Sequence, residues 1–308
     1  TAYEIGVRLV GSEMCIRDSI VAQRQLYAGT QLFLQSVCPR FGIEVTFVDG
    51  TESGAFDTAI QPGRTMLVFA ETPANPSLDL VDLAELGAIT RSTTVVDSTF
   101  ATPFGQNPIA YGVDLVLHSA TKGIAGHNDA TIGVIAGSAD LISWLWGFSV
   151  LHGANAAPFD AFNAHRGLRT LSARLTQQES TAYKVALFLE NHENILGVRY
   201  PGLESHPQHL LARRQMNNFG VTLTFDLQGD DVSVRNFLDA TRLIRQASSI
   251  GGPETLITHP ASTTHVGLSP GDLSAAGIGA GTIRLSCGLE HVDDVLDDLD
   301  QALAVVST

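Results

Sequence analysis

VDLVLHSATKGIAGHNDA, residues 113–130, is the stretch around which the rest of the chain is arranged. Its first five residues, Val113–Leu117, form an apolar run that predicts a buried strand. The run leads into Ser119, Thr121 and Lys122, whose hydroxyl groups suit a phosphate. Burial lowers the pKa of a lysine, so its amine becomes a nucleophile that can form a Schiff base with an aldehyde. The alternative is a strand that ends in an ordinary solvated lysine.

Two further apolar runs end in polar residues in the same way. Thr93–Asp97 ends in a carboxylate, and acids at the carboxyl ends of parallel strands lie where open α/β sheets bind ligands. Such an acid suits a protonated pyridine nitrogen, although Asp also commonly caps the next turn. The run Met66–Ala70 leads through Glu71 into a proline-restricted loop that holds Asn75. This loop also fits an ordinary strand-to-helix turn.

Taken together, these strand ends resemble one enzyme family. The segments ETPANP (71–76), VVDSTFATP (95–103) and HSATKGIAGHND (118–129) follow in an order and spacing similar to the Cys/Met-metabolism family of pyridoxal-phosphate enzymes. This family includes cystathionine γ-synthase, cystathionine γ-lyase, methionine γ-lyase and the O-acylhomoserine sulfhydrylases. The resemblance continues through RGLRTL (166–171), HPASTTH (259–265) and TIRLSCGLE (282–290), from roughly residue 20 to the end.

The resemblance implies the α/β fold of fold-type I pyridoxal-phosphate transferases, a mostly parallel sheet with flanking helices plus a smaller α+β C-terminal domain. We expect a cofactor-binding large domain over residues 20–171, and a C-terminal domain over 172–308 that begins with a long linking helix. Residues 1–19 match nothing in the family, so we expect a leader that is not native to the fold. The family's N-terminal phosphate loop and its Tyr/Arg pair are not found, which predicts an N-terminally incomplete chain.

Hydrophobic patterning places the remaining elements. Strands are expected at 43–48, 131–136, 220–227 and 282–287, and helices at 31–41, 78–89, 138–146, 172–192, 232–240 and 292–305.

Arg284 lies among apolar neighbours in the last predicted strand. A buried guanidinium needs a partner, and a substrate carboxylate fits its planar fork, although an internal Arg–Asp pair is the alternative. In the family this arginine holds the α-carboxylate of the amino acid. Arg166 and Arg169 are kept out of the site because arginines at helix starts usually form ion pairs.

The resemblance also assigns roles in the site. Lys122 carries pyridoxal 5'-phosphate and moves protons, and Tyr27 stacks on the ring and assists. The remaining expected cofactor ligands are Asn75, Asp97, Thr99, Ser119 and Thr121. The expected substrate ligands are Asn75, Ser249, Thr264 and Arg284.

Composition limits the partners. The 308 residues carry a net charge of −14, which argues against nucleic acid and against an anionic membrane surface. Three scattered cysteines (15, 38 and 287) predict neither a disulfide framework nor a metal cluster, and we expect His259 and His265 to be loop histidines rather than metal ligands. No membrane-spanning run and no secretory signal is evident, so we expect a cytoplasmic homotetramer that acts on small amino acids.

The expected reaction is γ-replacement on an activated homoserine in sulfur amino-acid metabolism, as in cystathionine γ-synthase. An O-acylhomoserine sulfhydrylase and a cystathionine or methionine γ-lyase are the alternatives, since Ser248 stands where many cystathionine-handling members have glutamate. A further alternative is an inactive fragment that lacks the N-terminal phosphate-binding segment.

Overall fold

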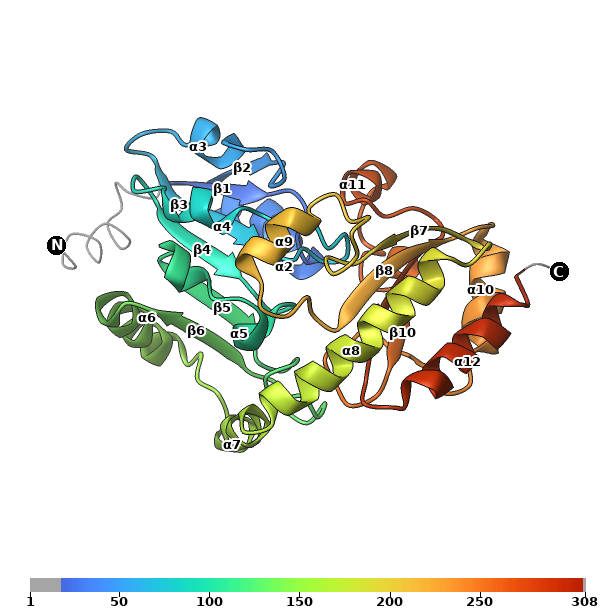
Figure 1. Ribbon diagram of the computed structural model, residues 1–308. Helices are drawn as coiled ribbons and strands as arrows, with labels where there is room; N and C mark the ends of the chain where they lie inside the picture. The colour runs from blue at the N-terminus through green and yellow to red at the C-terminus, as the bar shows by residue number, and fades with distance from the viewer. Residues whose placement is uncertain (1–17, 307–308) are drawn as a thin grey trace.

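The computed structural model describes residues 18–306, which form two β-sheets joined by one long helix (Figure 1). This helix, α8, spans Leu171–Glu190. It begins one residue before the predicted linking helix and ends two residues earlier. The first sheet is mostly parallel and the second mixed, as the predicted fold class requires.

The first sheet has the strand order β2-β1-β3-β4-β5-β6. β1 to β5 run parallel, and β6 pairs antiparallel with β5 at the edge. Parallel strands are covered on both faces by their crossover connections, which explains the nearly continuous apolar runs in the sequence. The strands are β1 Ser19–Gln23, β2 Glu44–Val48, β3 Thr65–Glu71, β4 Thr93–Asp97, β5 Leu115–Ser119 and β6 Gly133–Gly137.

Short helical segments connect these strands. Residues 28–41 are helical, but in three successive forms rather than as one α-helix from residue 31, and Pro39 lacks the N–H that a regular helix would need. The segments are α2 Ala28–Leu32, η1 Phe33–Val37, η2 Cys38–Phe41, α3 Ala55–Ala59, α4 Leu83–Gly87, α5 Thr102–Gly105, η3 Pro108–Tyr111, α6 Ala139–His152 and α7 Pro158–Leu168.

The helix predicted for residues 78–89 is wrong in extent, because α4 covers only its second half. Leu78 has a φ of 61°, which a helix does not allow. The N–H of Leu80 donates to a side chain from the second half of the chain. Asp82 then starts α4 by accepting the Ala84 N–H at 2.9 Å. The apolar residues of this stretch are buried all the same, so irregular chain produced a helix-like pattern.

The second sheet has the order β7-β8-β11-β10-β9 and is antiparallel except for the short β9–β10 pair. The predicted strands and helices of this part agree with the observed ones to within two residues at each end. The elements are β7 Ile195–Arg199, α9 His209–Gln215, β8 Thr222–Leu227, α10 Asp231–Ala240, β9 Arg245–Gln246, β10 Leu256–Thr258, η4 Pro260–Ser262, α11 Pro270–Ala275, β11 Thr282–Ser286 and α12 Val292–Leu303.

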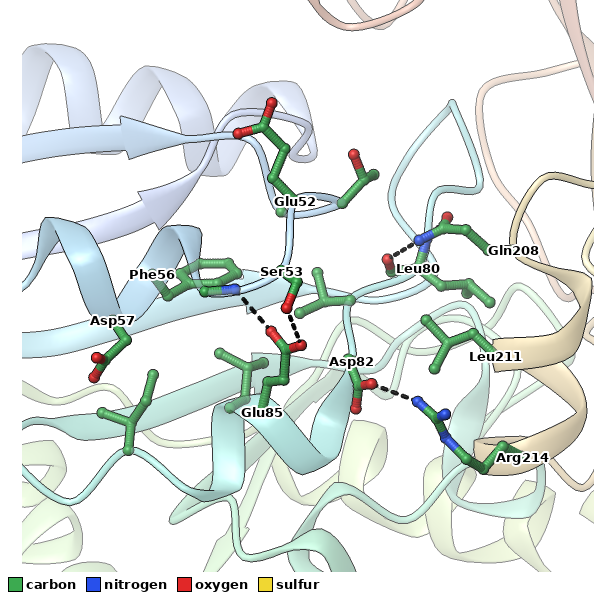
Figure 2. Close-up of a pocket in the computed structure, with 16 residues that line it drawn as sticks. Glu52, Ser53, Phe56, Asp57, Leu80, Asp82, Glu85, Gln208, Leu211 and Arg214 are labelled. Atoms are coloured by element: carbon green, nitrogen blue, oxygen red, sulfur yellow. Dashed lines mark hydrogen bonds and ion pairs between the residues drawn. The ribbon is translucent and has the colours of Figure 1, made fainter.

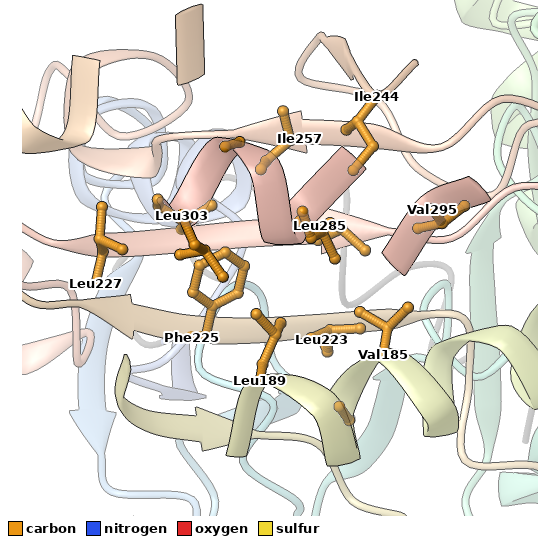
Figure 3. Close-up of a cluster of buried hydrophobic side chains, with 14 of the residues drawn as sticks. Val185, Leu189, Leu223, Phe225, Leu227, Ile244, Ile257, Leu285, Val295 and Leu303 are labelled. Carbon is orange, nitrogen blue, oxygen red and sulfur yellow. The ribbon is translucent and has the colours of Figure 1, made fainter. Parts of the chain in front are cut away.

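The largest apolar core lies between this sheet and helices α8, α10 and α12 (Figure 3). Leu189 of α8, Phe225 of β8, Leu285 of β11 and Leu303 of α12 are all fully buried there. Burial of each such side chain contributes about 2 kcal/mol. The core therefore fixes β11, the strand that also carries Arg284.

The start of the fold is earlier than expected from the sequence. Ser19, the last residue of the expected leader, is the first residue of β1, and its hydroxyl bonds Thr65 Oγ1 at 2.9 Å. Residues 1–17, which make up nearly all of that leader, lie outside the described residues.

Within residues 18–306, no helix combines the length and apolar composition that a bilayer span requires. The same residues contain no group of three or more His, Cys, Asp or Glu side chains placed to hold a metal ion. Cys38 and Cys287 are buried free thiols, whereas Cys15 lies outside the described part of the chain.

Candidate active site

The candidate site lies at the carboxyl edge of the first sheet, where that sheet meets β11. β3 ends at Glu71 and β4 at Asp97, and these two residues are direct neighbours in the strand register. β5 ends at Ser119, just before Lys122. A cavity of about 200 Å³, the Lys122 pocket, contains eight of the residues predicted to form the site: Tyr27, Asn75, Asp97, Thr99, Ser119, Lys122, Thr264 and Arg284.

The amine of Lys122 lies in this pocket and donates to Ser249 Oγ at 3.1 Å. Burial lowers the pKa of Lys122, and the nearby positive charge of Arg284 lowers this pKa further. A larger neutral fraction makes the amine a better nucleophile and a better base.

The backbone around Lys122 is held by Arg174 of α8, a residue that the sequence analysis did not single out. The buried guanidinium donates to the carbonyl oxygens of Gly123 at 2.9 Å and of Ile124 at 3.2 Å. Gly126 has a φ of 67°, and a Cβ there would lie 1.9 Å from the guanidinium. Only glycine lets the lysine loop approach the arginine this closely.

Asp97 is tied to the strand end beside it through Thr99. The N–H of Thr99 donates to Asp97 Oδ1 at 2.9 Å, and Thr99 Oγ1 accepts the N–H of Ser119 at 2.8 Å. Burial raises the pKa of Asp97, and its hydrogen bonds from Thr99 oppose that rise. A buried carboxylate of this kind gains stability when a positive group lies against it.

Arg284 reaches the pocket from β11 and is almost completely buried, with 3% of its surface exposed. It donates to Asn75 Oδ1 at 2.8 Å and to the carbonyl oxygen of Ser248 at 2.6 Å, both uncharged acceptors. It forms no ion pair with any carboxylate in the described chain, so the internal Arg–Asp pair is not what satisfies it. Burial lowers the pKa of Arg284 to about 10. An anionic ligand would supply the missing charge.

Glu71 also lines the pocket, although the sequence analysis did not include it among the site residues. Its two carboxyl oxygens accept the N–H groups of Tyr27 and Asn75, each at 2.8 Å. Burial raises the pKa of Glu71 well above its ordinary value, and the adjacent Asp97 adds to this rise. The signal that could have found it is an acid at the end of an otherwise apolar strand.

Tyr27 lies at the edge of the pocket and is half-exposed. Its ring lies close over Gly29, where a Cβ would be 2.6 Å from a ring carbon. The ring therefore has a broad face available for stacking.

Two threonines have hydroxyl groups that are engaged elsewhere. Thr121 lines a neighbouring cavity instead of the Lys122 pocket, and its Oγ1 accepts the Ile132 N–H at 2.8 Å. Thr264 lines the pocket, but its hydroxyl bonds Nδ1 of His265 at 2.8 Å rather than a group on Lys122.

A second cavity, the Arg214 pocket, lies between α4 and α9 and has charged residues at its rim (Figure 2). Arg214 pairs with Asp82, and Glu85 accepts from Ser53 Oγ and the Gly54 N–H. These charged groups already satisfy one another, so this cavity offers little to a ligand.

The Lys122 pocket fits the cofactor predicted from the sequence. It contains an amine with a lowered pKa for the aldehyde, a buried carboxylate for a pyridinium nitrogen, and an aromatic face beside them. Among the described residues, the hydroxyl of Ser119 has no hydrogen-bond partner, which leaves it free for a phosphate oxygen.

Comparison with known proteins agrees with this chemistry. The family model for "Cys/Met metabolism PLP-dependent enzyme" matches residues 10–304. An L-methionine gamma-lyase of Fusobacterium nucleatum subsp. polymorphum is 41% identical over 93% of this chain and 74% of its own length. An O-succinylhomoserine sulfhydrylase of Pseudomonas aeruginosa is 38% identical over 94% of this chain and 72% of its own.

Solved structures give the same result. The crystal structure of cystathionine gamma synthase from Xanthomonas oryzae pv. oryzae, in complex with aminoacrylate and cysteine, superimposes with a TM-score of 0.91 at 36% identity. It covers 99% of this chain, which in turn covers 79% of that structure. The chain belongs to the Cys/Met-metabolism family of pyridoxal-phosphate-dependent enzymes.

Proposed function

We propose that the Lys122 pocket catalyses γ-replacement on an activated homoserine, in the manner of a cystathionine γ-synthase. The observation that carries this proposal is Arg284, a buried guanidinium without a carboxylate partner in the described chain, in the same pocket as the amine of Lys122. Such a pair suits an α-amino acid, because one group binds the carboxylate and the other exchanges a proton.

Each residue contributes a defined step. Arg284 and Asn75 bind and orient the α-carboxylate, and the amine of Lys122 removes the α-proton. Asp97 carries the negative charge that a pyridinium nitrogen needs, and Tyr27 covers the ring. Pyridoxal phosphate, when bound, supplies an electron-accepting ring that stabilises negative charge on the substrate carbons. Ser119 is the side chain best placed to hold its phosphate.

The γ-substituent decides the reaction class. Removal of a β-proton expels the group on the γ-carbon, and a thiol that adds there gives γ-replacement. Without a thiol, hydrolytic release gives γ-elimination. Methionine γ-elimination is the second candidate, because the gamma-lyase relative is 41% identical and Ser248 occupies the position of the glutamate found in many cystathionine-handling enzymes.

One experiment separates these reactions. Purified protein with pyridoxal phosphate is given O-acylhomoserine with cysteine, O-acylhomoserine with sulfide, or methionine alone, and the products are identified by mass spectrometry. Cystathionine from the first mixture supports the proposal. Homocysteine from the second identifies a sulfhydrylase, and methanethiol with an α-keto acid from the third identifies a γ-lyase.

We also infer a homo-oligomer. α6 has no buried residue in the described chain, and large apolar side chains of α6 and α7 are exposed, among them Trp146, Leu151 and Phe159. An exposed apolar surface of this kind typically packs against another protein surface. Light scattering that shows only a monomer would contradict this inference.

A further inference from the structure

We propose that Glu71 is a positioning residue, which holds the stacking aromatic residue and the carboxylate-binding groups of the pocket in one arrangement. The side chain lies at the end of β3 and is buried, with 4% of its surface exposed. It touches neither the amine of Lys122 nor the fork of Arg284 through a hydrogen bond, so it acts through its neighbours.

Glu71 connects two loops with one carboxyl group. Oε2 accepts the N–H of Tyr27, which begins α2, and Oε1 accepts the N–H of Asn75 in the loop after β3. Its own N–H donates to Gln23 Oε1 at 2.9 Å, which anchors it to β1. The two loops are far apart in sequence and are joined by this side chain.

The Asn75 loop has few other anchors. Pro73 and Pro76 have no N–H, and the N–H groups of Thr72 and Ala74 donate to backbone oxygens. The N–H of Asn75 is therefore the one in this loop that a side chain holds. Asn75 Oδ1 in turn accepts from Arg284, so the position of Glu71 is transmitted to the fork that binds a carboxylate.

Electrostatics support the same role. Glu71 and Arg284 interact electrostatically inside the pocket, and the negative charge of Glu71 favours the charged form of Arg284. The adjacent Asp97 opposes ionisation of Glu71. A carboxyl group is retained here at an electrostatic cost, which is understandable if both of its oxygens are needed as acceptors.

The test uses Glu71→Gln, which keeps the shape but leaves one oxygen acceptor, so either Tyr27 or Asn75 loses its partner. Hydrogen–deuterium exchange of the protein, followed in peptides covering residues 24–31 and 71–78, should show about tenfold faster exchange in one of them. With pyridoxal phosphate bound, kcat/KM should fall by up to about 100-fold, mainly through KM, because the carboxylate-binding groups are displaced.

Asp298→Asn is the matched control, since buried Asp298 accepts the N–H groups of Arg242, Leu243 and Ile244 away from the pocket. It should speed exchange at 242–244 and leave KM unchanged. Unchanged exchange at both pocket peptides in Glu71→Gln, or an equal rise in KM in Asp298→Asn, would overturn the proposal.

Glu71→Asp tests the same geometry if Glu71→Gln does not fold. It keeps the charge but is one methylene shorter, so it cannot reach both amides, and one peptide should again exchange faster; protection at both would overturn the proposal. The exchange measurement does not depend on which amino acid is the substrate. Failure of the proposed reaction is thereby distinguished from failure of the role of Glu71.

Discussion

The Lys122 pocket and the Arg214 pocket both combine an arginine with carboxylates, but they treat these charges differently. Arg214 is 59% exposed at its side chain and is paired with Asp82. Arg284 is 3% exposed and has only uncharged protein partners in the described chain. An exposed pair is satisfied by its partner and by water, whereas a buried charge with neutral partners retains a strong demand for a counter-ion.

This contrast distinguishes a reactive site from a surface cavity better than the number of charged residues does. The Arg214 pocket has slightly more volume, about 260 Å³, and several carboxylates at its rim. In the Lys122 pocket, by contrast, burial shifts the pKa of Glu71, Asp97, Lys122 and Arg284 alike. Groups with perturbed pKa values that face one cavity are typical of catalytic sites.

The largest expected effect is the loss of Lys122. The chain contains two lysines, Lys122 and Lys184, and Lys184 is exposed on α8. Lys122→Ala should abolish the visible absorption that pyridoxal phosphate gains on binding and lower kcat by at least about 10³-fold. Lys184→Ala should change neither. Peptide mapping after borohydride reduction checks the assignment, and a cofactor label on Lys184 alone would refute it.

Exchange of arginine for lysine should separate the two pockets. Arg284→Lys keeps a positive charge but loses the planar fork that contacts Asn75 and Ser248, so KM for the amino acid should rise about 100-fold. Arg214→Lys should leave KM within about twofold, since exposed pairs contribute little. Steady-state kinetics of both variants measure this difference, and equal KM values would contradict the contrast.

A smaller effect is expected with pH at His265. Burial and the charge of Arg284 lower its pKa from 6.5 to about 4. The folded protein thus binds fewer protons than the unfolded chain between these values, and stability present above pH 6.5 is lost as the pH falls toward 4. The loss is at most about 3 kcal/mol.

His265→Gln should remove this contribution, so its free energy of unfolding relative to the unmodified protein should rise as the pH is lowered. Urea unfolding at several pH values between 7 and 4.5 measures the difference. A constant difference across this range would show that His265 titrates normally.

The smallest effect is expected at the Arg214 pocket itself. Arg214→Ala removes the pair with Asp82, which is largely exposed, and should change the free energy of unfolding by less than about 1 kcal/mol. Thermal unfolding with and without 0.5 M salt checks it, because a surface pair weakens with ionic strength. A change of several kcal/mol would show that the two pockets are more alike than their exposure suggests.

The sequence predicted those features that depend on local pattern. Thr93–Asp97 is a strand with the expected bounds, because its apolar run is continuous and ends in a carboxylate. The helix predicted for 78–89 failed, because irregular chain held by partners from distant segments buried the same apolar residues.

The site residues that were missed are those whose role lies in long-range contacts. Arg174 reads as an ordinary helix arginine, since nothing in the sequence indicates that it reaches the carbonyl groups of Gly123 and Ile124. Glu71 stands in a quoted motif, yet its two amide partners come from loops that only the folded chain brings together. Thr121 was expected at the cofactor, but pairing with Ile132 at the start of β6 occupies its hydroxyl.

Arg174 gives α8 an influence on substrate length. The arginine fastens the loop of Lys122 to this helix, and the same helix packs through Val185 and Leu189 on the core that fixes the strand of Arg284. The spacing between the proton-transferring amine and the carboxylate-binding fork is thus set by a rigid twenty-residue helix rather than by adaptable side chains. A substrate with one extra backbone carbon between its amino and carboxyl groups would have to be fitted to a ruler that does not stretch.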